Sequence, residues 1–506
     1  MSNFKSDSHK AMRAIQSMRL PLSLPLSLPL SLPASLSLSC AVLFLAACTV
    51  GPNYKGAPDV APHTLQQNAF QRTPAQGVST APGVAQWWKE LNDPVLNQLI
   101  ETALANNPDI KVSEARLRQS RAGLAQQQDN LLPKLSLSGT AIRTQRPNSL
   151  NSLGQAFGSS TGSGPLQYYT AGFDASWEID LFGGTRRAVE AATADAQAAQ
   201  ANLADAHVSL AAEVAQAYIN LRAQQQRNVI TRQSATYEQQ ILTLTQQRLS
   251  QGVASEADVE RAVTQVGTTR ASIAPIAADV SESLDRLAVL CGKEPGDLDA
   301  ILTNVAPLPL VPETVAIGNP ADLLQHRPDI RSAERNLVAM NAQIGEKEAD
   351  YFPKVTLYGA LGFSASTPGH LVRAANRNWL GVPYLSWDLF DFGRTRATVR
   401  SARAQLDEAQ ANYQKTVLGA LSDADTALSR YGHQRENVVQ LMDVETSANR
   451  SLSLVEQRYR GGTASLIDML DVQRTQLSAQ QNTLNGQAQL VQDFVAIQKS
   501  LGLGWE

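Results

Sequence analysis

The chain has 506 residues, of which 18% are charged and 6% aromatic, and its formal net charge is only −3. This charge does not suggest a nucleic-acid partner, and three cysteines are too few for a disulfide framework. The six histidines are scattered without the spacing of metal ligands, so we expect neither a metal site nor another cofactor.

The N-terminus has the order of a bacterial secretory signal. Basic residues precede an apolar, proline-studded stretch from Leu20 to Leu45, and small residues follow before Cys48. This Leu-Ala-Ala-Cys sequence resembles a lipobox, which predicts a signal peptide of residues 1–47 and a mature lipoprotein whose Cys48 carries diacylglycerol and palmitate. A transmembrane anchor is the alternative, but the repeated Leu-Pro-Leu-Ser would make a poor membrane helix. The leader is long, and Met1, Met12 and Met18 are all possible starts.

Residues 48–86 are rich in Pro, Gly, Gln and Ala, which predicts an extended, lipidated tether. Structure is expected from Trp87 onward, with helices at about 94–105 and 108–132 that each have proline in the first turn. A strand pair follows at about 134–178. Its first strand alternates in character through Leu135 and Leu137, and a Gly/Ser/Asn-rich loop at about 147–164 separates the two strands.

The longest predicted element is a helix from Thr185 to Gln251. This stretch contains no glycine or proline, the two main helix breakers. At about 1.5 Å per residue the helix would be roughly 100 Å long, so it must lie beside helices of similar length. The helix is expected to turn at Gly252 in a left-handed conformation, and Ser255 is expected to cap a return helix that ends near Leu290.

The second half of the chain repeats the first. Pro108-Asp109-Ile110 and Pro133-Lys134 recur 220 positions later, and from the strand that ends at Trp177 onward the offset is 210. A register kept over this length indicates a tandem duplication. The predicted repeats are residues 87–291, with a tip near 252, and 328–506, with a strand pair at about 354–390 and a tip near 462. A Pro-rich linker, 292–327, joins them.

Four strands of this length, with aromatic residues near their ends, are typical of an outer-membrane barrel. Four strands cannot close a barrel, and an open sheet edge is not viable in lipid. Two chains would give eight strands and a filled interior, whereas three would give twelve and leave a passage. A trimer is therefore the smallest assembly that could conduct, which predicts a mainly α-helical homotrimer with a 12-stranded β-barrel, four strands per chain. The long helices of the three chains would form a tube that continues the barrel.

Sequence patterns of enzymes are missing. There is no Gly-x-Ser-x-Gly elbow, zinc motif or dinucleotide fingerprint, and the carboxylates are spaced as on solvated helix faces. The leading hypothesis is a passive export duct rather than an enzyme. Two alternatives stay open: a duct for type I protein or peptide secretion, and a lipid-anchored coiled-coil scaffold that conducts nothing, although a scaffold has no use for the strands.

Several motifs together resemble the TolC-like outer membrane efflux proteins, specifically the OprM/NodT-type lipoprotein branch. The resemblance covers nearly the whole mature chain. It implies a homotrimeric efflux channel with a 12-stranded β-barrel and a periplasmic α-helical barrel, and a part in antibiotic resistance. The channel would be docked to a periplasmic adaptor and an inner-membrane RND-type pump and anchored in outer membrane lipid. The motifs are Cys48-Thr-Val-Gly-Pro-Asn-Tyr, Trp87-Trp88 with Asp93-Pro94, Trp177-Glu-Ile-Asp-Leu-Phe-Gly, Arg327-Pro-Asp-Ile, and Asp388-Leu-Phe-Asp-Phe-Gly-Arg.

The start of the second return helix is the predicted gate. Asp468, Asp471 and Arg474 are three residues apart and share one helical face, where Asp471 and Arg474 could pair within or between chains or remain an ordinary exposed pair. In the resemblance, Asp471 and Arg474 lie where OprM-type channels constrict their periplasmic mouth, and Tyr459 and Asp468 match gate positions of TolC.

One departure weakens the comparison of the gate, because Ala464 replaces the gate arginine of TolC.

The turns at the tips of the two helix pairs are expected to meet the adaptor. Their residues are Gly252, Ser255, Gly462 and Ser465.

Overall fold

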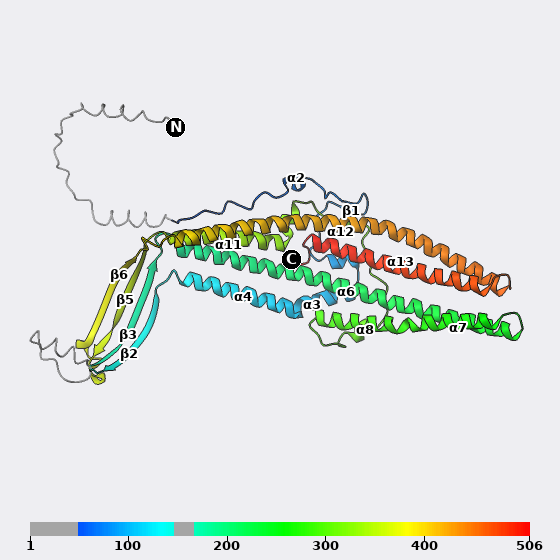
Figure 1. The fold of residues 1–506 in the computed structure, drawn as a ribbon, viewed down its shortest axis with the longest axis horizontal. Coiled ribbons are helices and arrows are strands. Elements are labelled where there is room, and N and C mark those ends of the chain that lie inside the picture. Colours follow the sequence, from blue (N-terminus) through cyan, green and yellow to red (C-terminus); the bar gives the residue numbers. More distant parts are fainter. Residues whose placement is uncertain (1–48, 146–165, 506) are drawn as a thin grey trace, which may run out of the picture. The chain divides into compact units, whose positions relative to one another are not determined.

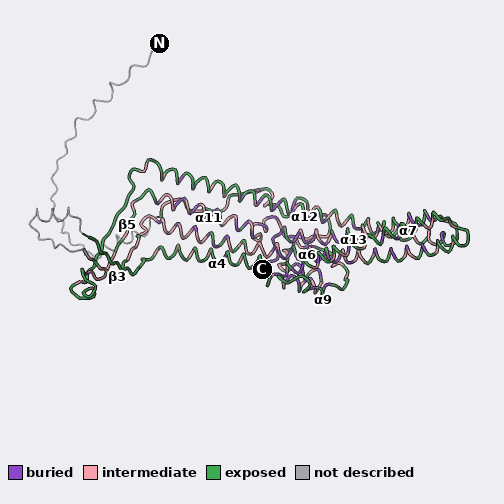
Figure 2. The backbone as a smooth tube through the Cα atoms, turned by 60° about the horizontal axis from the view of Figure 1, so that its bottom comes forward, coloured by how far each residue is buried: buried purple, intermediate pink, exposed green. Residues whose placement is uncertain are grey.

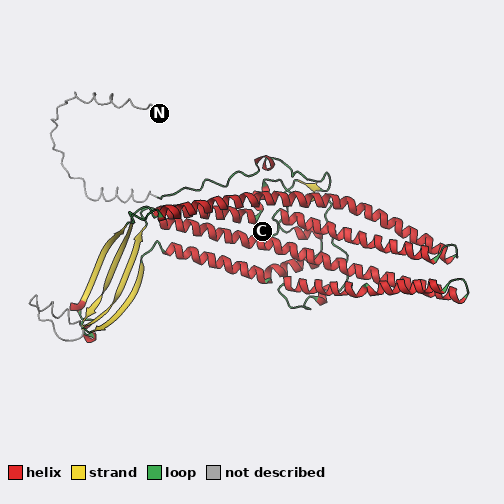
Figure 3. Cartoon of the chain, viewed as in Figure 1, coloured by secondary structure: helices red, strands yellow, loops and turns green. Residues whose placement is uncertain are grey.

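The structure is a computed structural model that describes residues 49–145 and 166–505. The predicted signal peptide, the predicted lipidation site Cys48, the whole Gly/Ser/Asn-rich loop and Glu506 lie outside the described residues. Within the described part, long helices and one larger sheet dominate (Figures 1 and 3), so the prediction of a mainly α-helical chain with a β part is confirmed.

The larger sheet has four antiparallel strands in the order β2-β3-β5-β6. The strands are β2 (Lys134–Thr144), β3 (Leu166–Ile179), β5 (Lys354–Ala365) and β6 (Arg377–Ser386). The central pair joins the two halves of the chain, with Ser176 opposite Tyr358. Among the described residues β2 and β6 each pair with one strand only, so the sheet has two open edges.

Four helices lead into and out of this sheet: α4 (Pro108–Asp129), α6 (Gly184–Ser250), α11 (Pro328–Ala349) and α12 (Arg394–Arg460). The element order recurs in the two halves, because α4 and α11 have 22 residues each and α6 and α12 have 67 each. The predicted long helix thus exists, shifted by one residue. Glycines in the left-handed conformation, Gly183 and Gly393, precede the two long helices.

The return helix of the first half differs from the prediction of one continuous helix. The structure has two helices, α7 (Glu256–Ala271) and α8 (Ile273–Leu290), interrupted at Ser272. Pro275 explains the break, because proline lacks an N–H and its ring clashes with the carbonyl four residues earlier. The second half has Asn485 at the corresponding position, and its return helix α13 (Leu466–Ser500) is continuous.

The hydrophobic core lies where α6, α12 and the return helices meet short elements from before α4 and from the linker (Figure 2). Trp87 is fully buried and packs edge-to-face on Trp88 and Phe494, with ring centroids 5.7 and 6.0 Å away. The short elements are η1 (Trp87–Leu91) and α3 (Pro94–Asn106), and in the linker α9 (Asp299–Leu302), β4 (Val315–Ala316) and α10 (Asp322–His326). Side chains of the linker complete this core, including Leu302 and Val315.

The N-terminal segment, residues 49–86, is extended as predicted, but it is bound to the helices rather than free. It contains one short helix, α2 (Pro62–Leu65), and its strand β1 (Val78–Ser79) pairs in parallel with β4. Val60 and Phe70 are buried in the core. The composition of this segment is that of a linker, yet its side chains pack against the helices and its carbonyls accept hydrogen bonds from them.

The motif that follows Cys48 makes the tightest of these contacts. Gly51 lies so close to Gly345 of α11 that a Cβ on Gly51 would be 2.3 Å from the Gly345 Cα. Buried Arg187 of α6 donates hydrogen bonds to the carbonyls of Val50 and Gly51 and, at 2.7 Å, to Asn53 Oδ1. The motif therefore fixes the start of the described chain at the beginning of α6.

Over the described ranges, none of the helices combines the length and the apolar character that a bilayer-crossing helix needs.

Candidate functional site

The two helical hairpins end in equivalent tips. Gly252 and Gly462 have φ of 73° and 77°, and a Cβ at either would meet no atom within 4 Å. Glycine is thus required by backbone conformation and not by space. Beyond the glycines, the Val253 and Thr463 amides donate to the carbonyls of Arg248 and Arg458 at 2.9 and 2.8 Å, which closes each helix end.

Each return helix begins with the same capping box. Ser255 Oγ accepts the amide of Asp258 at 3.2 Å, and Ser465 Oγ accepts that of Asp468 at 3.1 Å. In return, each carboxylate accepts hydrogen bonds from the serine of its own box, Asp258 from Ser255 and Asp468 from Ser465. These bonds lower the pKa of both carboxyl groups. The structure therefore gives Asp468 a capping role within its own helix, independent of any gate.

Removing either cap should loosen the first turn of its return helix. Ser255→Ala and Ser465→Ala are each expected to cost about 1 kcal/mol, which corresponds to roughly fivefold faster local opening. Hydrogen exchange of the amides after each tip measures this. Ser250→Ala is the matched control, because Ser250 only donates to the Gln247 carbonyl inside α6; equal exchange in the cap and control variants would contradict the assignment.

Tyr459, a predicted gate residue, lies buried between the two hairpins with only 3% of its surface exposed. Its hydroxyl is 3.0 Å from Thr245 Oγ1, and the Arg248 guanidinium lies 4.2 Å above its ring. Arg248 also donates to the carbonyls of Tyr459 and Arg460. We call Tyr459, Thr245 and Arg248 the inter-hairpin latch, because it joins α6 to the end of α12.

The other predicted gate residues do not join this latch. Asp471 and Arg474 of α13 are exposed, and no ion pair between them exists in the described part of the chain. The predicted pairing within one chain is therefore not realised, and pairing between chains stays a prediction. Sequence reasoning missed Arg248 and Thr245; the recurrence of Arg248 as Arg458 was visible but gave no sign of a contact between hairpins.

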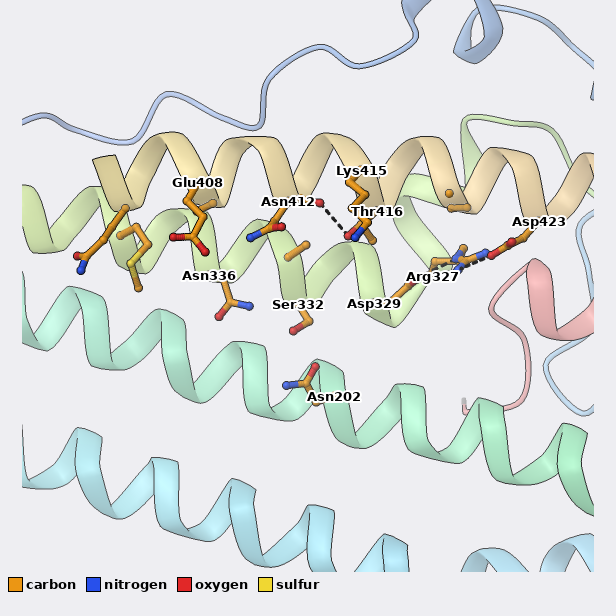
Figure 4. A pocket seen from close by; sticks show the side chains of 16 residues that line it. Asn202, Arg327, Asp329, Ser332, Asn336, Glu408, Asn412, Lys415, Thr416 and Asp423 are labelled. Carbon is orange, nitrogen blue, oxygen red and sulfur yellow. Dashed lines mark hydrogen bonds and ion pairs between the residues drawn. The ribbon is translucent and has the colours of Figure 1, made fainter. Parts of the chain in front are cut away.

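A cavity of about 790 Å³ opens between α6, α11 and α12 (Figure 4). We call it the polar recess. It is lined mainly by charged and amide side chains: Asn202, Arg327, Asp329, Asn336, Glu408, Asn412, Lys415 and Asp423. Arg327 lies 2.7 Å from Asp329 and 3.6 Å from Asp423, so its charge is neutralised inside the chain.

The polar recess and the N-terminal segment occupy opposite faces of α11. Glu334 and Asn341 bond to the segment, through the Tyr54 hydroxyl at 3.3 Å and the Pro52 carbonyl at 2.9 Å. Ser332 and Asn336, each two residues from Glu334, line the recess. With about 3.6 residues per turn these side chains point about half a turn away. One face of the helical layer is thus covered and the other is polar and open.

These arrangements bind and pair helices but show no catalytic geometry. Across residues 49–145 and 166–505, no group of three or more His, Cys, Asp or Glu side chains could hold a metal ion. Cys291 is a buried free thiol, and burial raises its pKa to about 11, so it is not poised as a nucleophile.

Comparison with known proteins gives a family match over most of the chain. A family model described as outer membrane efflux protein matches residues 99–293 and 319–503. The two matched ranges contain the two hairpins and all four strands of the larger sheet.

Individual relatives extend this match to nearly full length. The antibiotic efflux pump outer membrane protein ArpC of Pseudomonas putida is 31% identical over 93% of this chain and 95% of that protein. The outer-membrane channel OprN is 35% identical, with a TM-score of 0.81 over 90% of this chain and 100% of that one. The open state of the Neisseria gonorrhoeae MtrE outer membrane channel is 26% identical, with a TM-score of 0.78, covering 91% of this chain and 99% of that one.

Proposed function

The chain belongs to the outer membrane efflux protein family, and on this premise we propose that it is the outer membrane channel subunit of a tripartite efflux pump. In this proposal it passively conducts drugs and other toxic small molecules from the periplasm to the exterior. Its partners are two further copies of itself, a periplasmic adaptor and an inner-membrane RND-type pump. It is not an enzyme and needs no cofactor.

The observation that carries this proposal is the open-edged sheet. Its strands expose large apolar side chains, with exposed fractions of 68% for Leu135, 73% for Leu137 and 80% for Trp379. Such a surface belongs in lipid rather than water. Because an unpaired edge is costly in lipid, β2 and β6 must pair with other chains, and three chains give a 12-stranded barrel with room for a passage.

The helical layer supports a duct that continues from this barrel. Its polar recess face is suited to the water-filled interior, and the face covered by the N-terminal segment is suited to the outside. In the trimer the helices α4, α6, α11 and α12 of each chain would then form the wall of a periplasmic α-helical barrel. The tips at Gly252 and Gly462, with Ser255 and Ser465, are the proposed adaptor contacts.

The position of Thr49 supports lipid anchoring at Cys48. Thr49 packs against Gly183, since a Cβ there would be 2.2 Å from the Thr49 Cγ2, and Gly183 lies between β3 and α6. This junction is where the barrel would leave the membrane. An acyl chain on Cys48 would therefore enter the inner leaflet of the outer membrane beside the barrel. Mass spectrometry of the mature protein tests this, and an unmodified Cys48 thiol would contradict it.

Export measurements test the function itself. Cells lacking the gene should accumulate dyes and antibiotics, and expression of the intact chain should restore their export. Purified protein should conduct ions in planar bilayers, which a coiled-coil scaffold would not. A protein-secretion duct would instead restore export of a secreted polypeptide and leave dye accumulation unchanged.

We also predict that Asp471 and Arg474 constrict the periplasmic mouth by pairing between chains. Asp471→Ala with Arg474→Ala should raise single-channel conductance and sensitise cells to large antibiotics. An exposed ion pair is worth only a few tenths of a kcal/mol, but three such pairs between chains would act at a narrow axis where charge is focused. Unchanged conductance and no added leak in the double variant would remove these residues from the gate and leave the channel assignment intact.

A further inference from the structure

The larger sheet has one apolar face and one polar face. Side chains alternate between the two faces along a strand, and residues opposite each other in a ladder share a face. One row of apolar side chains crosses all four strands: Leu137, Phe173, Leu361 and Trp379. On the other face, the Ser138 hydroxyl donates to Asp174. In a membrane the apolar face meets lipid and the polar face meets the passage.

Two exposed arginines lie at one end of the apolar face. Arg143 is the second-last residue of β2, and Arg377 is the first residue of β6. Arg143 is six positions from Leu137. Arg377 is two positions from Trp379. Because both separations are even, the two arginines belong to the apolar face, at the end of the sheet away from the helices (Figure 1).

The charged side chains at this end of the sheet are all basic in the described part of the chain. Three stretches form this end: residues 139–145, 166–172 and 361–380. They contain neither aspartate nor glutamate. Arg373, in the connection between β5 and β6, is also exposed, and we call Arg143, Arg373 and Arg377 the basic rim. None of the three forms an ion pair with another described residue, so the rim suits an anionic partner.

We propose that the basic rim binds the phosphate groups of lipid A, the phosphorylated glycolipid in the outer leaflet of a bacterial outer membrane. This inference rests on the proposed channel function, which turns the rim end of the sheet toward the exterior. Guanidinium groups bind phosphate through two parallel hydrogen bonds. An arginine on the lipid face is costly at the membrane centre but not at the interface, where a phosphate can bind it.

The length of the strands places the arginines at the level of the headgroups. Eight positions separate Arg143 from Leu135 and Arg377 from Leu385, which is about 26 Å along a strand at roughly 3.3 Å per residue. With a strand tilt of about 40° this is about 20 Å of membrane height, slightly less than an apolar band of about 25 Å. The long arginine side chain covers the remaining height, because its stem lies along apolar surface while its charged group reaches the interface.

Apolar side chains beside the arginines favour a lipid over free phosphate. Trp379 is 80% exposed near Arg377, and Val372 is 78% exposed next to Arg373. Aromatic residues gather where the apolar band meets the headgroups. A lipid presents phosphate and acyl chains together, so it can contact both kinds of side chain. A phosphate ion can contact only the arginines.

Lipid A binding to the full-length protein in detergent, measured by native mass spectrometry, tests the basic rim. Arg143→Gln with Arg377→Gln should lower the affinity for lipid A at least fivefold, whereas Arg143→Lys with Arg377→Lys should retain most of it, because the charge remains. Lys134→Gln is the matched control for Arg143→Gln. Lys134 is exposed at the other end of β2, and its variant should bind lipid A as the intact chain does.

Three further probes identify the bound group on the intact chain, so they do not depend on the folding of a variant. Lipid A without its phosphates and phosphatidylglycerol should each bind at least fivefold more weakly than lipid A. Inorganic phosphate at the same concentration should not displace lipid A.

Four results would overturn the inference, even in a protein that conducts ions and exports dyes. These are equal affinity for lipid A with and without phosphates, equal affinity for phosphatidylglycerol, displacement by inorganic phosphate, and unchanged binding by the double glutamine variant. A chain that binds lipid A as expected but neither conducts nor exports would instead overturn the proposed function and leave the lipid site standing.

Discussion

Replacing Arg248 and Tyr459 together with alanine should leave the channel leaky, with higher single-channel conductance and greater entry of large antibiotics. The inter-hairpin latch holds the end of α12 against α6 close to the tips. Tyr459 is almost completely buried, and removal of a buried aromatic side chain costs about 3–5 kcal/mol. Removal of Arg248 also takes away its hydrogen bonds to the carbonyls of Tyr459 and Arg460, so the two hairpins should separate at their periplasmic end.

Single substitutions separate the contributions. Tyr459→Phe removes only the hydrogen bond to Thr245 and should give a small effect. Arg248→Ala removes the cation–π contact and the hydrogen bonds to the Tyr459 and Arg460 carbonyls, and should give a clear leak that is smaller than that of the double variant. The matched control is Arg458→Ala, because Arg458 is the repeat counterpart of Arg248 and only donates to the nearby Thr463 carbonyl at 3.4 Å. If the Arg248 and Arg458 variants conduct alike, the latch does not keep the channel closed.

The long helices could be predicted because helix breakers are local signals. Thr185 to Gln251 lacks glycine and proline, and α6 occupies almost the same residues. The strands could be predicted from alternation through Leu135 and Leu137, since side-chain direction alternates strictly along a strand. Capping at Ser255 and Ser465 could be predicted for a similar reason, because a capping box needs residues only three positions apart.

The break in the first return helix has a local signal in the sequence. Pro275 lies well inside the predicted helix, where proline removes a backbone hydrogen bond. The two halves differ at this position, since Asn485 is the counterpart of Pro275 in the continuous α13.

Contacts distant in sequence could not be predicted by the same means. Tyr459 and Arg248 are 211 positions apart, and their contact depends on how two hairpins lie side by side. No periodicity within either helix specifies that arrangement. Likewise, composition makes the N-terminal segment resemble a free linker, because the residues that hold it, such as Arg187 and Asn341, lie in distant helices.

Substituting Arg187 with alanine should release the start of the N-terminal segment from the bundle. The Arg187 side chain is only 5% exposed and donates to the carbonyls of Val50 and Gly51, the Asn53 amide oxygen and, at 2.7 Å, to Glu190. Hydrogen bonds from a charged donor are worth about 1.5–3 kcal/mol each. Losing the set should cost at least about 2 kcal/mol, or roughly thirtyfold in local opening.

Hydrogen exchange at Val50 measures the release, because its amide donates to the Phe182 carbonyl at 3.0 Å and becomes accessible when the segment lifts. Arg186→Ala is the matched control: the neighbouring Arg186 side chain bonds to Asp180 and not to the segment. The second half has Ala397 at the position that corresponds to Arg187. Because no second N-terminal segment lies there, the arginine is present only in the half where it binds the segment. If Val50 exchanges equally fast in the two variants, Arg187 does not hold the segment in place. The position of the proposed lipid anchor beside the barrel must then depend on other contacts, such as that between Gly51 and Gly345.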